Sequence, residues 1–526
     1  MVFYAKAFML IAMLTSIQKN LQQQIEHAIN HSKLNDAHLL LINNIKNTPD
    51  DHFSYFLLAQ VNVAANDISK ANKLLSKAIS IEPLPLYFAH SAKFSVLRGQ
   101  LLDAQQYITE AIKHPYYEVI ECDLIANVLT RLGHYPLALE WQLRAYQQAP
   151  NNPQISYNLA VAYKIMGQFS DAILLLQMLV KQYPQHFQAH YSLAELNNNK
   201  QAKQHLQQLL TLTEYAKTPM QQQFLHHAIA LNYEHCADYK QAFAHFTTSK
   251  QAIYQHVKYD AQAHKAFCQQ LITLSHRYTP SLSDNDFTPI FIVGMPRSGT
   301  TLLEKIMNQS DLVQGVGELN DIAQVCQGNN AQALNSVVLN DAYKNAALMA
   351  QLSQYKQRIS QLVAAQLRSC DKQPFNFYYI DLILAAFPKA KIICMQRGRK
   401  ASCIANYRQL YSPASAFHHY SYNLQDIDSF YQDYSSLINH FAVKHPDNVM
   451  IMQYETLVSE PITSTQLLYD FCDLPWQVKC LDFHKQHSPS ATASKVQVRQ
   501  PLNNKAIDYW QHYGFAFNAK DKDPFR

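Results

Sequence analysis

The chain has 526 residues and a mass of 60.3 kDa, enough for two or three domains with separate hydrophobic cores. The composition is that of a globular protein, with 48% hydrophobic and 16% charged residues. The net charge is only +5, and the sequence contains no block of lysine or arginine, which argues against a general nucleic-acid-binding protein. A local basic pocket for an anionic small molecule remains compatible with this charge.

Residues 1–17 form an N-terminal extension whose apolar run, "FMLIAML", is too short to span a bilayer. Its weakly charged start disfavours a signal peptide, so we expect no stable membrane span. The nine cysteines are scattered and contain no C-x-x-C pair. This usage is typical of a reducing compartment, so we expect a cytoplasmic protein without a disulfide framework or a metal site.

Residues 18–274 carry an internal repeat, because two columns of alanine recur at spacings of 33, 34 and 34 residues. The columns are Ala71, Ala104, Ala138 and Ala172 and, twelve residues earlier in each unit, Ala59, Ala92, Ala126 and Ala160. Each unit predicts two amphipathic helices that approach closely at the alanines, with a tight turn between them. A degenerate copy starts near residue 18, and a late copy spans 223–255.

The clearest copy, "ISYNLAVAYKIMGQFSDAILLLQMLVKQYP", resembles the tetratricopeptide repeat. The resemblance implies an all-α solenoid that binds an acceptor peptide or a partner protein, or that docks only to the neighbouring domain. The repeats end near residue 274. The stretch 275–288 has turn-forming residues and no hydrophobic period, which predicts a linker.

Residues 289–526 show a different pattern. Short apolar runs at 289–293, 390–395 and 448–454 are separated by helical stretches. They predict an α/β domain with a parallel sheet that is covered by helices on both faces. Ligands of such sheets lie beyond the carboxyl ends of the strands, so we expect the site in the loops that follow these three runs.

The first of these loops lies in "FIVGMPRSGTTLLEKIM", residues 291–307. Gly294 and Gly299 have the spacing of a nucleoside triphosphate loop, but Thr300 stands where the lysine is required. Backbone amides and a helix beginning near Ser298 direct positive partial charge at an anion. No acidic strand end that would hold magnesium is recognisable, so the loop suits an anion other than a triphosphate. The expected donors are Arg297, Ser298, Gly299, Thr300 and Thr301.

At "PRSGTTLLEKIM" the chain resembles the cytosolic and tyrosylprotein sulfotransferases, and bacterial proteins that join tetratricopeptide repeats to a sulfotransferase domain. The resemblance implies a P-loop-like fold and metal-independent transfer from the co-substrate 3′-phosphoadenosine-5′-phosphosulfate (PAPS). It implies that Glu318 in "GVGEL" is the catalytic base, with Lys372 in "DKQPFNF" neutralising the leaving oxygen. Arg297 would act in both binding and catalysis.

The segment "MQRGRKASCIANY" resembles the part of the family that binds the 3′-phosphate of the donor. Arg397 matches the arginine at the strand end, but Ala405 replaces the serine eight residues later, and Arg-Gly replaces Arg-Asp. Ser402, one helical turn before Ala405, is a candidate to compensate. Further donor contacts implied by the resemblance are Tyr454 in "QYETL" and Ser494 and Arg499 in "ATASKVQVRQP".

A glutamate base, where the cytosolic branch has a histidine, favours protein tyrosine as the acceptor. A saccharide, a lipid or a small metabolite stays open as the acceptor. Two other classes of protein are weighed against a transferase. A repeat scaffold with a decayed transferase half is supported by Ala405, and a nucleoside kinase or triphosphatase is opposed by Thr300.

Overall fold

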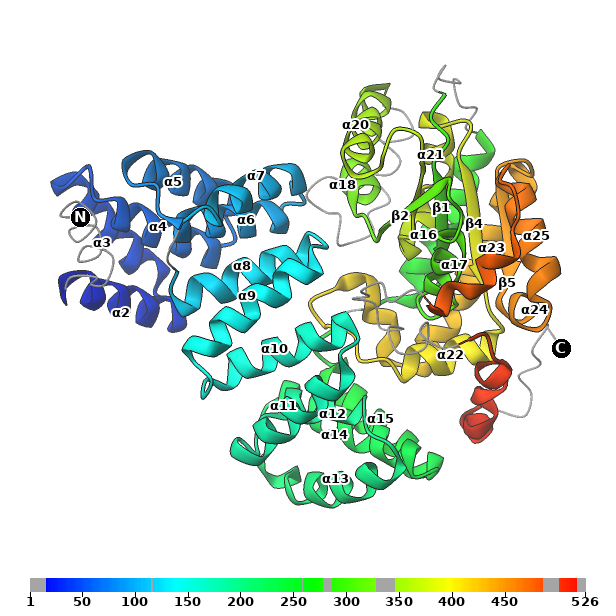
Figure 1. The fold of residues 1–526 in the computed structure, drawn as a ribbon, viewed down its shortest axis with the longest axis horizontal. Helices are drawn as coiled ribbons and strands as arrows, with labels where there is room; N and C mark the ends of the chain where they lie inside the picture. The colour runs from blue at the N-terminus through cyan, green and yellow to red at the C-terminus, as the bar shows by residue number, and fades with distance from the viewer. Residues whose placement is uncertain are drawn as a thin grey trace. The chain divides into compact units, whose positions relative to one another are not determined.

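The computed structural model describes residues 16–114, 117–257, 259–277, 286–327, 346–485 and 501–517. The chain divides into two compact units, Met1–Ala162 and Tyr163–Arg526, and the boundary falls inside helix α10. Figure 1 shows the helices of the repeat region in blue to green and the sheet further along the chain.

The repeat region is all-helical, as predicted. Its helices are α2 (Ser16–Asn30), α3 (Leu34–Asn47), α4 (His52–Ala64), α5 (Ile68–Ile81), α6 (Pro85–Leu97), α7 (Leu101–Ala111), α8 (Val119–Arg131), α9 (Tyr135–Gln148), α10 (Pro153–Met166), α11 (Phe169–Gln182), α12 (Phe187–Ala194), α13 (Asn199–Thr211), α14 (Pro219–His235), α15 (Tyr239–Tyr254) and α16 (Ala261–Arg277).

The two alanine columns lie on paired helices, one column on the first helix of each pair and the other on the second, from α4 to α11. All eight alanines are at most 2% exposed, which confirms that they lie where the helices meet. In the pairs α4–α5, α6–α7, α8–α9, α10–α11 and α14–α15 the tight turn has one residue in the left-handed region. Gly133 has a φ of +84° there, and Asn66 and Ala237 take the same place in two pairs without a glycine.

The second unit contains a five-stranded, all-parallel sheet in the order β2-β3-β1-β4-β5. The strands are β1 (Ile290–Gly294), β2 (Val313–Gly317), β3 (Arg368–Asp371), β4 (Lys391–Gln396) and β5 (Val449–Gln453). The predicted apolar runs are β1, β4 and β5. The prediction missed β2 and β3, which are short and polar or glycine-containing.

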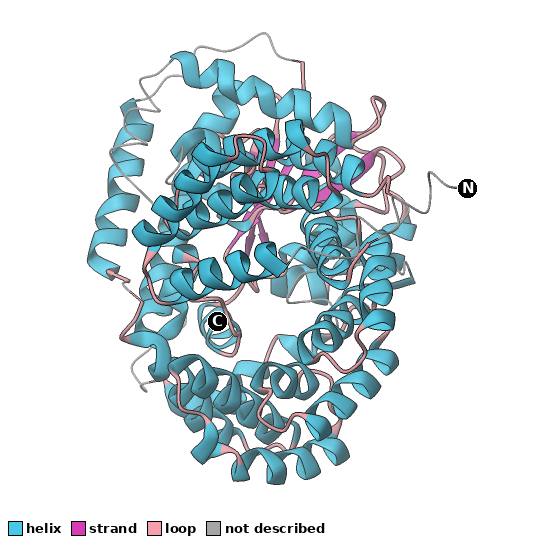
Figure 2. Ribbon diagram, turned by 90° about the vertical axis from the view of Figure 1, so that its left-hand side faces the viewer, coloured by secondary structure: helices cyan, strands magenta, loops and turns pink. Residues whose placement is uncertain are grey.

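Helices cover both faces of the sheet, as the apolar runs predict, because residues of α21 and α23 lie in one core and residues of α17 and α25 lie in the other. The strands are coloured magenta in Figure 2. Phe291 and Val293 of β1 pack into one core, whereas Ile290 and Ile292 pack into a second core with α17. The helices of this part are α17 (Thr300–Met307), α18 (Asp321–Gln327), α20 (Ala346–Leu362), α21 (Ile380–Ala386), α22 (Arg399–Tyr407), α23 (Leu424–Lys444), α24 (Tyr454–Ser459) and α25 (Pro461–Phe471).

The last repeat helices share the first of these cores. Ala230 of α14, Phe246 of α15 and Leu271 of α16 belong to the same buried cluster as Phe291 of the sheet. The late helices and the sheet therefore form one compact unit. Helix α16 extends to Arg277, into the linker predicted at 275–288, and residues 278–285 lie outside the described residues. The domain limits drawn from the sequence stay a prediction.

Among the described helices, none has the length and apolar character needed to cross a membrane. All nine cysteines are free thiols in this structure.

Candidate active site

The loop between β1 and α17 depends on its two glycines for space. A Cβ atom on Gly294 would lie 2.6 Å from the carbonyl oxygen of Met395 on β4. Gly299 has a φ of +111°, and a Cβ atom there would lie 2.6 Å from the ring of Tyr454. The helix begins at Thr300, two residues after Ser298, because Gly299 still has a left-handed backbone conformation.

The loop donors are largely buried. Ser298, Thr300 and Thr301 are all buried, and the Ser298 hydroxyl has no hydrogen-bond partner among the described residues. Arg297 has a φ of +68°, which is uncommon for a residue with a side chain. Burial lowers the pKa of Arg297, and the charges of Arg408 and Arg397 lower it further. The loop therefore lies in a buried, positively charged environment that suits an anion.

Arg397 follows β4 directly and reaches the same loop. Its Nη1 donates to the Arg297 carbonyl oxygen at 3.3 Å, and its Nη2 donates to the carbonyl oxygen of Ala506. Its guanidinium carbon lies 4.8 Å from the centre of the Tyr454 ring. The Arg397 Nε is buried without a hydrogen-bond partner among the described residues. An unused, buried donor on a cation is what an incoming phosphate oxygen would satisfy.

The substitution at Ala405 leaves Ser402 as the nearby hydroxyl. Ser402 is buried, and its Oγ donates to the Arg397 carbonyl oxygen at 3.1 Å. Its hydroxyl thus holds the turn that presents Arg397. Ser494 and Arg499 lie outside the described residues.

Glu318 and Lys372 meet because they follow neighbouring parallel strands, β2 and β3. The Lys372 amide donates to the Gly317 carbonyl oxygen at 2.9 Å, and Lys372 Nζ donates to Glu318 Oε1. The Lys372 side chain is buried, whereas that of Glu318 is 47% exposed. Burial lowers the pKa of Lys372, but the charges of Glu318 and Glu304 outweigh burial, so the net pKa is raised. Lys372 is therefore a fixed buried cation beside an accessible carboxylate.

Tyr411 and His418 connect the two parts of the site. Burial raises the pKa of Tyr411, Arg297 lowers it, and Glu318 raises it, so the phenol is electrostatically coupled to both. The Tyr411 ring stacks on His418 with centroids 4.3 Å apart, and its hydroxyl donates to Asn406 Oδ1 at 3.1 Å. Asn406 Nδ2 in turn donates to the Pro296 carbonyl oxygen of the loop at 2.9 Å.

An acidic strand end does exist at Asp371, which the sequence did not reveal. In the sheet, Asp371 pairs with Phe291 of β1, which lies three residues before Gly294 at the start of the anion loop. Tyr355 donates to Asp371 Oδ2 at 3.0 Å, and burial raises the pKa of Asp371 well above its ordinary value. One Asp371 oxygen is thus already engaged by the Tyr355 hydroxyl inside the buried core.

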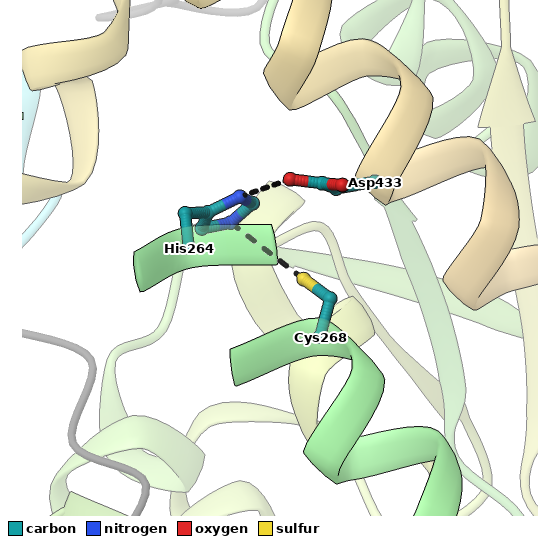
Figure 3. Close-up of side chains that lie close together, drawn as sticks. All are labelled: His264, Cys268 and Asp433. Atoms are coloured by element: carbon teal, nitrogen blue, oxygen red, sulfur yellow. Dashed lines mark hydrogen bonds and ion pairs between the residues drawn. The ribbon is translucent and has the colours of Figure 1, made fainter. Parts of the chain in front are cut away.

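A second cluster of polar side chains lies between α16 and α23 (Figure 3). His264 Nδ1 contacts Asp433 Oδ2 at 2.9 Å, and the other ring nitrogen contacts the Tyr378 hydroxyl at 2.8 Å and Cys268 Sγ at 3.8 Å. In this arrangement the contacts with Asp433 and Tyr378 engage both ring nitrogens of His264. The cluster is a buried hydrogen-bond network that joins the two helices.

Comparison with known proteins identifies the two parts of the chain. Residues 289–478 match the model of the sulfotransferase family, and residues 143–196 match that of the tetratricopeptide repeat. The second half contains a sulfotransferase-family domain. Its fold and the loop after β1 thus agree with the resemblance drawn from "PRSGTTLLEKIM".

The relatives that match this chain are distant. An uncharacterized protein of Aquifex aeolicus is 27% identical over 292 residues, covering 52% of this chain and 38% of that protein. Protein-tyrosine sulfotransferase 1 of Danio rerio is 26% identical over 250 residues, covering 44% of this chain and 68% of that enzyme. A solved sulfotransferase domain of the Synechococcus PCC 7002 olefin synthase is 17% identical, with a TM-score of 0.33, and covers 45% and 99%.

Proposed function

We propose that the protein transfers a sulfuryl group from PAPS to a hydroxyl, with protein tyrosine as the acceptor. The observation that carries this proposal is the Glu318–Lys372 pair together with a buried anion loop that carries Arg297 and that Arg397 contacts. A sulfotransferase-family domain accounts for both features. The donor and the acceptor are the parts that need testing.

The residues present fit the donor. The Ser298 hydroxyl and the Arg397 Nε are buried donors without a partner among the described residues, and both suit phosphate or sulfonate oxygens. The loop from Arg297 to Thr301 would hold the 5′-phosphosulfate. Arg397 would hold the 3′-phosphate, and Ser402 would fix the turn that presents it.

Transfer needs a base on the acceptor side and a cation on the leaving side. Glu318 would take the proton of the acceptor hydroxyl as its oxygen forms a bond to sulfur. The bond between sulfur and the oxygen of the 5′-phosphate would break at the same time, and adenosine 3′,5′-bisphosphate would leave with the electron pair. Lys372 would neutralise the charge on that oxygen, and its burial keeps the ammonium in place before the reaction starts.

The choice of tyrosine rests on the relatives and on the glutamate. Several matched proteins are named as protein-tyrosine sulfotransferases, including those of Danio rerio and Drosophila melanogaster. The exposed side of Glu318 is open to a bulky acceptor. Tetratricopeptide repeats generally mediate protein interactions, so here they would engage the acceptor protein.

The test is transfer of radioactive sulfate from PAPS to a tyrosine peptide by the wild type, Glu318→Gln, and the exposed control Glu214→Gln. We expect Glu318→Gln to lose about 100-fold or more in turnover, the contribution of a general base, with unchanged affinity for the bisphosphate. The control should equal the wild type. Turnover on a saccharide alone would move the acceptor to that class, and no donor binding at all would leave a repeat scaffold.

A further inference from the structure

Five polar contacts join repeat helices α14 and α15 to the segment around residues 407–422 of the transferase domain. Most of the groups involved are buried, and all lie in the second compact unit. Glu234 pairs with Arg408, His227 Nε2 donates to the Arg408 carbonyl oxygen, Lys250 Nζ donates to the Gln409 carbonyl oxygen, Tyr407 donates to Thr247 and Gln223 donates to the Tyr422 hydroxyl.

Lys250 is the least expected member of this set. Its side chain is 0% exposed, and no described carboxylate forms an ion pair with it. The ammonium donates to the Gln409 carbonyl oxygen at 2.7 Å and lies 4.9 to 5.9 Å from the ring centres of Tyr422, Tyr411 and Tyr407. Burial of such a cation lowers the stability of the fold, so a lysine kept at this position is expected to have another role.

The segment that Lys250 holds leads directly to the site. Arg408 and Gln409, which receive the repeat contacts, come at the end of α22, and Tyr411 follows two residues later. The Tyr411 hydroxyl donates to Asn406 Oδ1 at 3.1 Å, and Asn406 Nδ2 donates to the Pro296 carbonyl oxygen of the loop at 2.9 Å. Arg297 and Glu318, the proposed base, also act on the pKa of Tyr411. Arg408 is one of the cations that act on Arg297. A displacement of residues 408–411 would therefore reach both the donor loop and the base.

We propose that α14 and α15 form part of the transferase site, with Lys250 and Glu234 as positioning residues that hold residues 408–411 against Arg297 and Glu318. The inference rests on the proposed function for its catalytic consequence. The last repeat pair is thus not only a surface for a partner. Removal of the repeats would leave an incomplete site.

The experiment compares Lys250→Met with Lys240→Met, a control that makes the same change at an exposed position of the same helix. Hydrogen exchange of the amides of 408–415 is measured with thermal unfolding and calorimetric titration of adenosine 3′,5′-bisphosphate. Lys250→Met should exchange faster in this segment and bind the bisphosphate about tenfold more weakly, since small displacements at a site have large effects. Its unfolding temperature should stay equal or rise, because a buried charge is removed.

If Lys250→Met lowered both the affinity for the bisphosphate and the unfolding temperature, Lys250 would have a structural role only, and the proposal would be overturned. Unchanged exchange or unchanged affinity in Lys250→Met would overturn it too. Glu234→Gln, which keeps the shape of the side chain, should reproduce the faster exchange. If the wild type binds no bisphosphate, the proposed function fails, whereas hydrogen exchange still decides whether the repeats hold this segment.

Discussion

Replacing Lys250 by methionine should change how the stability of the protein depends on pH. Burial lowers the pKa of Lys250 to about 7, from an ordinary value of 10.5. Between these values the unfolded chain binds more protons than the folded one, so the wild type gains stability as the pH rises from 7 to 10.5. Methionine has no proton to bind. The advantage of the variant should therefore be largest at pH 7 and below, and should vanish near pH 10.5.

The size of the effect follows from the same two pKa values. At about 1.4 kcal/mol per pH unit, they set an upper limit of about 5 kcal/mol on the cost of the buried ammonium at pH 7. The variant also loses the hydrogen bond to Gln409, which costs about 1 kcal/mol. A net stabilisation of a few kcal/mol at pH 7 is the expected outcome.

The assay is urea unfolding of the wild type and the Lys250→Met variant between pH 6.5 and 10, followed by circular dichroism. The exposed control Lys240→Met should keep a constant difference from the wild type. If the curves for Lys250→Met and the wild type run parallel over this pH range, Lys250 does not carry a strongly lowered pKa, and the account of its burial is wrong.

Two further substitutions test the geometry of the site. Gly299→Ala should destabilise the protein by about 1 to 3 kcal/mol and weaken bisphosphate binding. The added methyl group strains the left-handed backbone and pushes Tyr454 away from Arg397. An unchanged unfolding temperature and an unchanged calorimetric affinity would contradict this. Asp371→Asn should keep transfer activity. It should also gain stability over the wild type as the pH rises above about 4, the ordinary pKa of aspartate, because burial raises the pKa of Asp371 in the folded wild type. Loss of a magnesium-dependent activity in this variant would reveal a metal ligand instead.

The sequence predicted the elements that have strong local patterns. The alanine columns mark the buried faces of the repeat helices, and continuous apolar runs mark the buried strands β1, β4 and β5. All of these elements form as expected. The strands β2 and β3 contain polar residues or glycine in place of an apolar run, so no local pattern marks them. Their carboxyl ends nevertheless carry Glu318 and Lys372, which only the family resemblance indicated.

The contacts between repeats and transferase could not be predicted from local patterns. Lys250 and Gln409 are 159 positions apart, and nothing in the sequence near either residue marks the other. Tyr411 and Asn406 were likewise missed, because their role depends on where α22 ends beside the loop. Asp371 was missed as an acidic strand end because its strand was not recognised.

The central claim is that the buried, cationic loop binds the nucleotide of a sulfate donor. Calorimetric titration with adenosine 3′,5′-bisphosphate in the absence of magnesium, beside ATP, tests this most directly. The account predicts tight, metal-independent binding of the bisphosphate that falls about tenfold to a hundredfold in Arg297→Ala, since hydrogen bonds to charged groups are worth about 1.5 to 3 kcal/mol. No binding of the bisphosphate, or binding of ATP alone and only with magnesium, would contradict it.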